Sequence, residues 1–171
     1  MDELTKLAVK HGTDKWGKHS YSPYYYDLFK DRKNSVSKVL EIGVAEGAGM
    51  RMFRDFFPNA MIYGAEIDPD RVISEDRIIT YECDQYSNSD LLNLIDHTGT
   101  DIDLVVDDGS HIPDHQIYTA TSLMSVLDPG VIYIIEDVAS PRVAKALSDY
   151  KIEVKEFSKR YDDRIIKITH E

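Results

Sequence analysis

Two acidic clusters in the sequence are candidate metal ligands. Asp107-Asp108-Gly109-Ser110-His111 follows the apolar run 102–106, and Glu136-Asp137 follows the apolar run 131–135. If these runs form neighbouring strands about 4.8 Å apart, the carboxylates that end them would crowd one edge of the sheet and repel one another. A divalent cation would relieve that repulsion. Oxygen ligands without cysteine favour Mg²⁺, with Mn²⁺ or Ca²⁺ as alternatives.

His111 is the candidate general base of this site. It lies three residues after Asp108, close enough to face the same cavity. Imidazole titrates near neutrality and can accept a proton from a hydroxyl that a metal polarises. The alternative interpretation is an aspartate that caps a helix, followed by a structural histidine.

A glycine-rich turn, Glu41-Ile42-Gly43-Val44-Ala45-Glu46-Gly47-Ala48-Gly49, follows an earlier apolar run. Its glycines let the backbone turn tightly and let a ligand come close. The spacing G-x-x-x-G-x-G differs from the dinucleotide-binding pattern G-x-G-x-x-G. Glu41 would repel a phosphate but suits a cationic amino-acid group, so the turn is similar to the cofactor loop of S-adenosylmethionine (SAM) methyltransferases. The alternative is an ordinary turn at the start of a helix.

Polar residues also end the second and third expected strands. Carboxylates at Glu66 and Asp68 can accept hydrogen bonds from ribose hydroxyls, and Asp84-Gln85 can accept one from an adenine amino group. Taken singly, each acid could equally cap a helix or lie in a solvated loop. The predicted cofactor-binding residues are Glu41, Gly43, Gly47, Glu66, Asp68, Asp84, Gln85 and Asp107.

The elements that must position these residues alternate between strand and helix from Val36 onward, which predicts an α/β fold with a parallel sheet covered on both faces. Two alternating segments near the C-terminus predict an antiparallel hairpin around Asp162-Asp163. Five parallel strands and this hairpin give the seven-stranded, mostly parallel Rossmann-like sheet of SAM methyltransferases. The expected strands are 36–42, 61–67, 77–83, 102–106, 131–135, 152–157 and 164–168.

Residues 1–33 form a distinct, aromatic-rich segment before the expected core at 36–171. Helical spacing of apolar residues predicts two short helices on either side of a glycine-bearing loop. The segment would be either a lid that closes over SAM and the acceptor or a fixed cover on the sheet. We expect residues 1–171 to form a single domain.

Composition excludes several classes of protein. With 31 acidic and 20 basic residues, the net charge of −11 disfavours binding to bare nucleic acid. The lone thiol, Cys83, excludes an internal disulfide and a cysteine-rich zinc site. No apolar run approaches the ~20 residues that cross a bilayer, and the start of the chain lacks the pattern of a signal peptide. These features predict a cytoplasmic protein with no membrane association.

The motifs together resemble the macrocin and mycinamicin sugar O-methyltransferase family, with cephalosporin hydroxylase-like proteins as more distant relatives. Glu41-x-Gly43, Asp107 to His111, Ile135-Glu136-Asp137 and the early His11-Gly12-Thr13-Asp14-Lys15 carry this resemblance. It implies Mg²⁺ ligands at Asp108, Glu136 and Asp137, and a base at His111. The chain lacks that family's aromatic-rich loop after Asp137, so the resemblance does not imply a macrolide acceptor.

These observations predict Mg²⁺-dependent methyl transfer from SAM to a hydroxyl of a sugar or glycosylated metabolite. A metal ion held by Asp108 would lower the pKa of the acceptor hydroxyl. His111 would then take the proton of that hydroxyl. One alternative is methylation of another polar or phosphorylated small molecule. Another is a SAM-binding module without catalysis. The expected partner is a small-molecule or glycan acceptor, and a homo-oligomer is possible.

Overall fold

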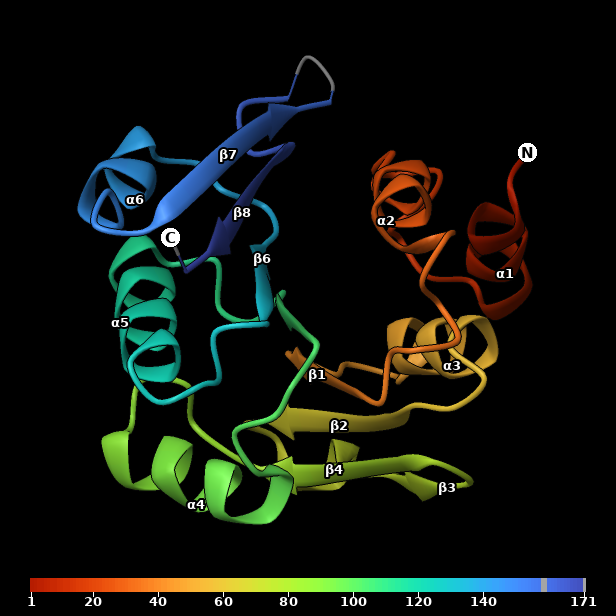
Figure 1. Cartoon of the computed structure of the whole chain (residues 1–171), viewed down its shortest axis with the longest axis horizontal. Helices are drawn as coiled ribbons and strands as arrows, with labels where there is room; N and C mark the ends of the chain where they lie inside the picture. Colours follow the sequence, from red (N-terminus) through yellow and green to blue (C-terminus); the bar gives the residue numbers. More distant parts are fainter. Residues whose placement is uncertain (158–159, 171) are drawn as a thin grey trace.

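The computed structural model describes residues 1–157 and 160–170. Two N-terminal helices precede an alternation of strands and helices (Figure 1). The helices are α1 Glu3–His11, α2 Ser22–Phe29, α3 Ala48–Phe56, α4 Asn88–Thr98, α5 Pro113–Met124 and α6 Pro141–Ala146, with a short 3₁₀ helix at Pro69–Arg71. The strands are β1 Lys38–Ile42, β2 Met61–Glu66, β3 Ser74–Glu75, β4 Ile78–Glu82, β5 Leu104–Asp107, β6 Ile132–Ile135, β7 Lys151–Glu156 and β8 Arg164–Thr169.

The strands form one mixed sheet in the order β3-β4-β2-β1-β5-β6-β8-β7. β4, β2, β1, β5 and β6 run parallel, and β8 and β7 follow as an antiparallel hairpin. The seven predicted strands and the C-terminal hairpin are confirmed. The described sheet also has an eighth strand, β3, whose two residues pair antiparallel with β4 at the edge. So short a strand carries no alternation that a sequence pattern could detect.

The switch point of the sheet lies at β1, which pairs with β2 on one side and with β5 on the other. In open parallel sheets, ligands bind beyond the carboxyl ends of the strands at such a point. Ile42 and Asp107, which end β1 and β5, are partners in the register. The glycine-rich turn and the acidic loop therefore leave the sheet side by side.

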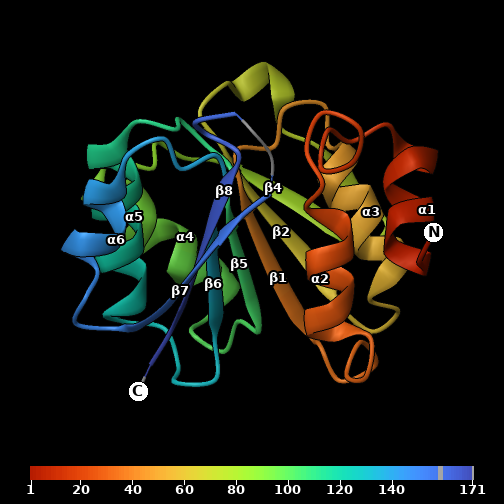
Figure 2. The ribbon, with the colours of Figure 1, turned by 90° about the horizontal axis from the view of Figure 1, so that it is seen from above.

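Helices cover both faces of the sheet, with α1, α2 and α3 on one face and α4, α5 and α6 on the other (Figure 2). Each face has its own buried apolar cluster. Successive strand residues point to opposite faces, so Val39 packs in one cluster and Leu40 in the other. Among the described helices, none is long and apolar enough to cross a membrane.

The two predicted N-terminal helices are present and are part of the core. α1 packs against α2 and α3. Tyr21, Tyr25 and Phe29 are fully buried, and the ring of Tyr25 meets that of Phe53 edge-on, with ring centres 5.4 Å apart. This packing favours the interpretation of residues 1–33 as a fixed cover rather than a moving lid.

Candidate active site

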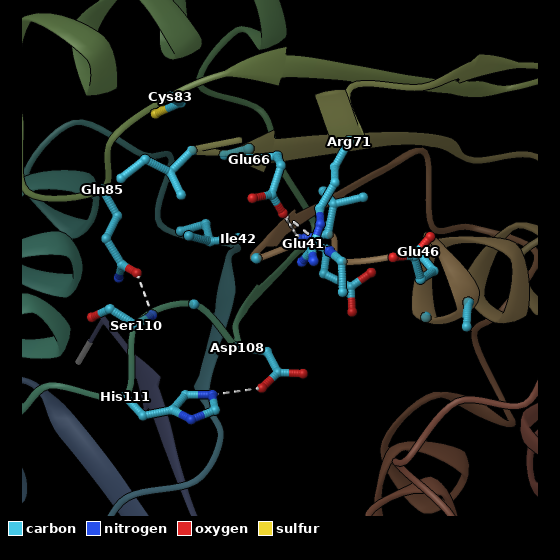
Figure 3. Close-up of a pocket in the computed structure, with 18 of the residues that line it drawn as sticks. Glu41, Ile42, Glu46, Glu66, Arg71, Cys83, Gln85, Asp108, Ser110 and His111 are labelled. Atoms are coloured by element: carbon cyan, nitrogen blue, oxygen red, sulfur yellow. Dashed lines mark hydrogen bonds and ion pairs between the residues drawn. The ribbon is translucent and has the colours of Figure 1, made fainter. Parts of the chain in front are cut away.

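A cavity of about 610 Å³ opens at the carboxyl ends of the central strands (Figure 3). Its volume is within the range of small-molecule sites. The glycine-rich turn forms one part of the wall, and residues 12–15 form another. Seven predicted site residues line it: Glu41, Gly43, Glu66, Asp84, Gln85, Asp108 and His111.

The other predicted site residues lie outside the described lining of this cavity. Gly47 precedes α3 with φ 76°, and Asp68 caps the 3₁₀ helix that follows it. Asp107 is buried behind the acidic loop, and Glu136 and Asp137 are buried just after β6. Gly47 and Asp68 thus shape the backbone beside the cavity, and their role in cofactor binding stays a prediction.

Glu66, at the end of β2, holds the glycine-rich turn. Its carboxylate accepts hydrogen bonds from the amides of Val44 and Ala45, at 2.9 and 3.0 Å. Gly43, with φ 85°, comes so close to the acidic loop that a Cβ atom there would lie 2.7 Å from Cα of Gly109. Since only glycine fits both the conformation and this approach, the turn and the acidic loop are sterically coupled.

A buried lysine joins the acids that end three neighbouring strands. Lys15 Nζ lies 2.8 Å from Asp108 Oδ2 and 2.8 Å from Glu136 Oε2. It is also 3.2 Å from Glu41 Oε1. The hydroxyl of Tyr25 donates to the other oxygen of Glu136, at 2.6 Å. Both oxygens of Glu136 are thus engaged, and one ammonium faces three carboxylates.

The pKa values of this cluster reflect burial and shared charge. Burial alone would lower the pKa of Lys15, but the surrounding carboxylates raise it well above its usual value. Burial raises the pKa of Glu136 well above that of a free carboxyl, and that of Glu41 to about 7, although Lys15 opposes both shifts. Burial also disfavours ionised Asp108, yet Lys15 and the bond to His111 hold its pKa well below the usual range. Asp108 is therefore ionised at neutral pH.

Asp108, His111 and Asp137 form a group with the spacing of a metal site. One potential ligand atom of each lies within 4.8 Å of the other two. His111 Nε2 is 3.1 Å from Asp108 Oδ1 and 3.8 Å from Asp137 Oδ2. The hydrogen bond with Asp108 raises the pKa of His111. Because Oδ2 of Asp108 faces Lys15, the two oxygens of this carboxylate serve two different groups.

Asp107 supports the acidic loop from behind. It accepts hydrogen bonds from Gln85 Nε2 and from the hydroxyl of Tyr133, both at 3.1 Å. Gln85 Oε1 in turn accepts from the amide of Ser110, at 2.7 Å. Burial raises the pKa of Asp107 to about 6, in spite of these bonds. Asp107 and Gln85 thus belong to one buried network, of which Gln85 reaches the cavity.

No known protein-family model matches the chain. The 8-demethyl-8-alpha-L-rhamnosyl tetracenomycin-C 2'-O-methyltransferase of Streptomyces olivaceus is 37% identical over 142 residues, which cover 79% of this chain and 37% of that protein. The mycinamicin VI 2''-O-methyltransferase of Micromonospora griseorubida is 35% identical over 144 residues, which cover 80% of this chain and 36% of that protein. The chain is a homologue of sugar O-methyltransferases. The resemblance carried by its motifs is confirmed.

Solved structures agree with this relationship. MycE from the mycinamycin biosynthetic pathway, in complex with Mg, SAH and mycinamycin VI, has a TM-score of 0.84 and 28% identity, and the match covers 98% of this chain and 54% of that one. Human methyltransferase-like protein 13 in complex with SAH has a TM-score of 0.64 at 16% identity, which shows the fold alone. The Rossmann-like methyltransferase fold is confirmed. The chain spans less than two fifths of its curated relatives and about half of MycE.

Sequence reasoning missed the groups that hold the acids in place. It interpreted the aromatic N-terminal segment as a lid or cover and gave Lys15, Tyr21 and Tyr25 no contact with the acids. The hydroxyl of Tyr21 donates to Asp137 at 2.7 Å, and the hydroxyl of Tyr25 donates to Glu136 at 2.6 Å. The available signal was that this segment combines several phenol groups with lysine and histidine, which a purely apolar cover would not need.

Proposed function

We propose that this chain is a domain of a Mg²⁺-assisted O-methyltransferase that transfers a methyl group from SAM to a hydroxyl of a sugar or glycosylated metabolite. The observation that carries the proposal is that Asp108 and His111 line the same cavity as Glu66 and the glycine-rich turn. Groups suited to bind the methyl donor, SAM, and groups suited to activate a hydroxyl thus line the same cavity. The activities of the curated relatives, and MycE with Mg and SAH, support the same assignment.

The cavity wall suits SAM on chemical grounds. Glu41 Oε2 is a buried oxygen to which no described group donates, so it can accept from the ammonium of the methionine part. Glu66 Oε1 accepts one hydrogen bond, from the amide of Asp68 at 3.0 Å, and keeps acceptor capacity for a ribose hydroxyl. Asp84 and Gln85 would bind the adenine end. When bound, SAM supplies an activated methyl group on its sulfonium.

The acid cluster suits a divalent cation because its carboxylates outnumber the single ammonium of Lys15. Asp108 and Asp137 each offer an oxygen within 4.8 Å of the other and of His111, so we assign these two carboxylates as ligands. Glu136 lies beside them with its oxygens on Lys15 and a tyrosine, and its role as third ligand stays a prediction. When bound, the ion acts as a Lewis acid that lowers the pKa of the acceptor hydroxyl.

The side chains themselves orient the reactants and accept the proton, since methyl transfer needs no protein nucleophile. His111 is partly exposed and would take the proton of the acceptor hydroxyl. Asp108 orients its imidazole through the 3.1 Å contact. His115 is placed differently, because it bonds to Ser110 Oγ at 2.9 Å and stacks on Tyr86. We further propose a small-molecule glycoside as acceptor, while the cytoplasmic location and a homo-oligomeric state stay predictions.

The test combines calorimetry with SAH and transfer of labelled methyl from SAM to a panel of rhamnosides and other glycosides, with and without Mg²⁺. His111→Ala should lower kcat by about 10²- to 10⁴-fold and leave SAH affinity unchanged, because a general base acts only in the chemical step. His115→Ala is the matched control and should keep most of the turnover. A protein that does not bind SAH, or that turns over fully in a chelator, contradicts the proposal.

A further inference from the structure

The N-terminal segment 13–25 reaches the acids that follow β6. The hydroxyl of Tyr21 donates to Asp137 Oδ1 at 2.7 Å, across 116 positions of the sequence. Tyr21 is fully buried, and Asp137 is buried as well. A buried phenol requires a hydrogen-bond partner, and here that partner is a carboxylate of the proposed metal site.

His19, in the same segment, lies between two carboxylates. Its Nδ1 is 2.9 Å from Asp163 Oδ1, and its Nε2 is 3.6 Å from Asp137 Oδ1. The ring stacks on Tyr21 with ring centres 4.7 Å apart. Nε2 is buried and has no hydrogen-bond partner among the described residues. His19 thus lies beside Asp137, at a distance slightly longer than a hydrogen bond.

The same segment holds the neighbouring acid in a parallel way. Glu136 accepts from Lys15 through one oxygen and from Tyr25 through the other, at 2.8 and 2.6 Å. Lys15, His19, Tyr21 and Tyr25 come from a stretch of 11 positions (15–25), and each is fully or almost fully buried. An apolar cover would achieve the same packing with phenylalanine and leucine, so packing alone does not explain these polar groups.

We infer that segment 13–25 is a positioning element for the proposed metal site, in which the hydroxyl of Tyr21 fixes the carboxylate of Asp137 and the ring of His19 packs beside it. The inference rests on the proposed function, because it assumes that Asp137 is a metal ligand. Partners behind a metal ligand fix its orientation, and their loss typically lowers metal affinity about 10- to 100-fold.

The decisive variant is Tyr21→Phe, which removes one oxygen atom and keeps the ring. Mn²⁺ is the probe, and its affinity for the full chain is measured by calorimetry or by the electron paramagnetic resonance of free Mn²⁺. We expect about 10- to 100-fold weaker Mn²⁺ binding, with SAH affinity within twofold of the wild type. Tyr24→Phe is the matched control, because Tyr24 lies three residues after Tyr21, in α2, but donates at 3.4 Å to Glu153 of the C-terminal hairpin.

The outcomes separate this inference from the function it rests on. A wild-type protein that binds SAH but no Mn²⁺ removes the metal site and the inference together. A wild-type protein that binds Mn²⁺, with Tyr21→Phe unchanged, overturns the inference alone. So does a variant in which Mn²⁺ affinity, SAH affinity and melting temperature all fall together, since that is a loss of packing. If Tyr21→Phe does not fold, His19→Gln takes its place, with the same expected split between Mn²⁺ and SAH.

Discussion

Replacing Asp107 with asparagine tests the buried network behind the site. Asp107 is 1% exposed, and burial raises the pKa of its carboxyl group to about 6 in spite of hydrogen bonds from Tyr133 and Gln85. Asparagine keeps the size and one acceptor oxygen but cannot ionise. We expect Asp107→Asn to become more stable relative to the wild type as the pH rises.

The size of this effect follows from the two pKa values of the group. The carboxyl titrates near 3.8 in the unfolded chain and near 6 in the folded one. As the pH rises, the unfolded state releases the proton first, so the folded state of the wild type loses stability between about pH 4 and pH 6. About 2 pKa units correspond to about 3 kcal/mol of unfolding free energy. Asp107→Asn does not lose stability in this way. At every pH, however, its free energy of unfolding is lower by about 1 kcal/mol for each hydrogen bond that the amide makes less well than the carboxyl group.

Urea denaturation of both proteins at about pH 4 and about pH 7.5 measures the difference. The advantage of Asp107→Asn should grow by about 2 to 2.5 kcal/mol between the two, because part of the loss has already occurred at pH 4 and the other titrating groups, common to both proteins, cancel. An advantage that is constant or shrinks with pH refutes the reasoning, since Asp107 would then titrate as an ordinary carboxyl. SAH affinity should stay the same, because Asp107 lies behind the cavity wall. A strong loss of affinity would support its predicted role in cofactor binding instead.

Two further predictions concern the turn and the N-terminal cover. Gly43→Ala should weaken SAH binding more than tenfold in calorimetry, because the added Cβ would clash with the backbone of Gly109 and because φ at this position is 85°. Gly130→Ala is the control and should bind SAH normally, since a Cβ there meets nothing within 4 Å. Deletion of residues 1–33 should abolish cooperative thermal unfolding, since Tyr21 and other aromatic side chains of this segment are fully buried. A folded fragment that still binds SAH would mean that the segment is a dispensable lid.

The sheet could be predicted because strands buried on both faces are continuous apolar runs. Runs such as 102–106 and 131–135 carry that signal locally. The acids after them could be placed together because the carboxyl ends of parallel strands share one edge of the sheet. β3 could not be predicted, because its two residues join the sheet through backbone pairing alone.

The partners of the acids could not be predicted in the same way. Lys15 contacts Asp108 and Glu136 across 93 and 121 positions, and no local spacing carries that information. Lysine is almost never fully buried unless it is paired, so its place in the core depends on the very acids that it holds. The sequence pattern also does not distinguish the roles of the adjacent acids Glu136 and Asp137. In the structure Glu136 bonds to Lys15, whereas Asp137 lies near His111.

In the loops of this site, the residue type determines both the chemistry of the side chain and the backbone conformation that the residue can adopt. Among the described residues, the non-glycine residues with positive φ are Ala45, Arg77, His111 and Asp137, and three of these four lie in the loops of the site. This conformation costs about 1–2 kcal/mol for most residues, but Asp, Asn and His adopt it more readily. The side chains that can bind a metal or accept a proton here are thus also the ones that tolerate the backbone. Asp137→Asn should therefore weaken Mn²⁺ binding in calorimetry with little change in melting temperature, whereas Asp137→Ala should lower both. Equal melting temperatures for the two variants would show that the backbone at this position is not under strain.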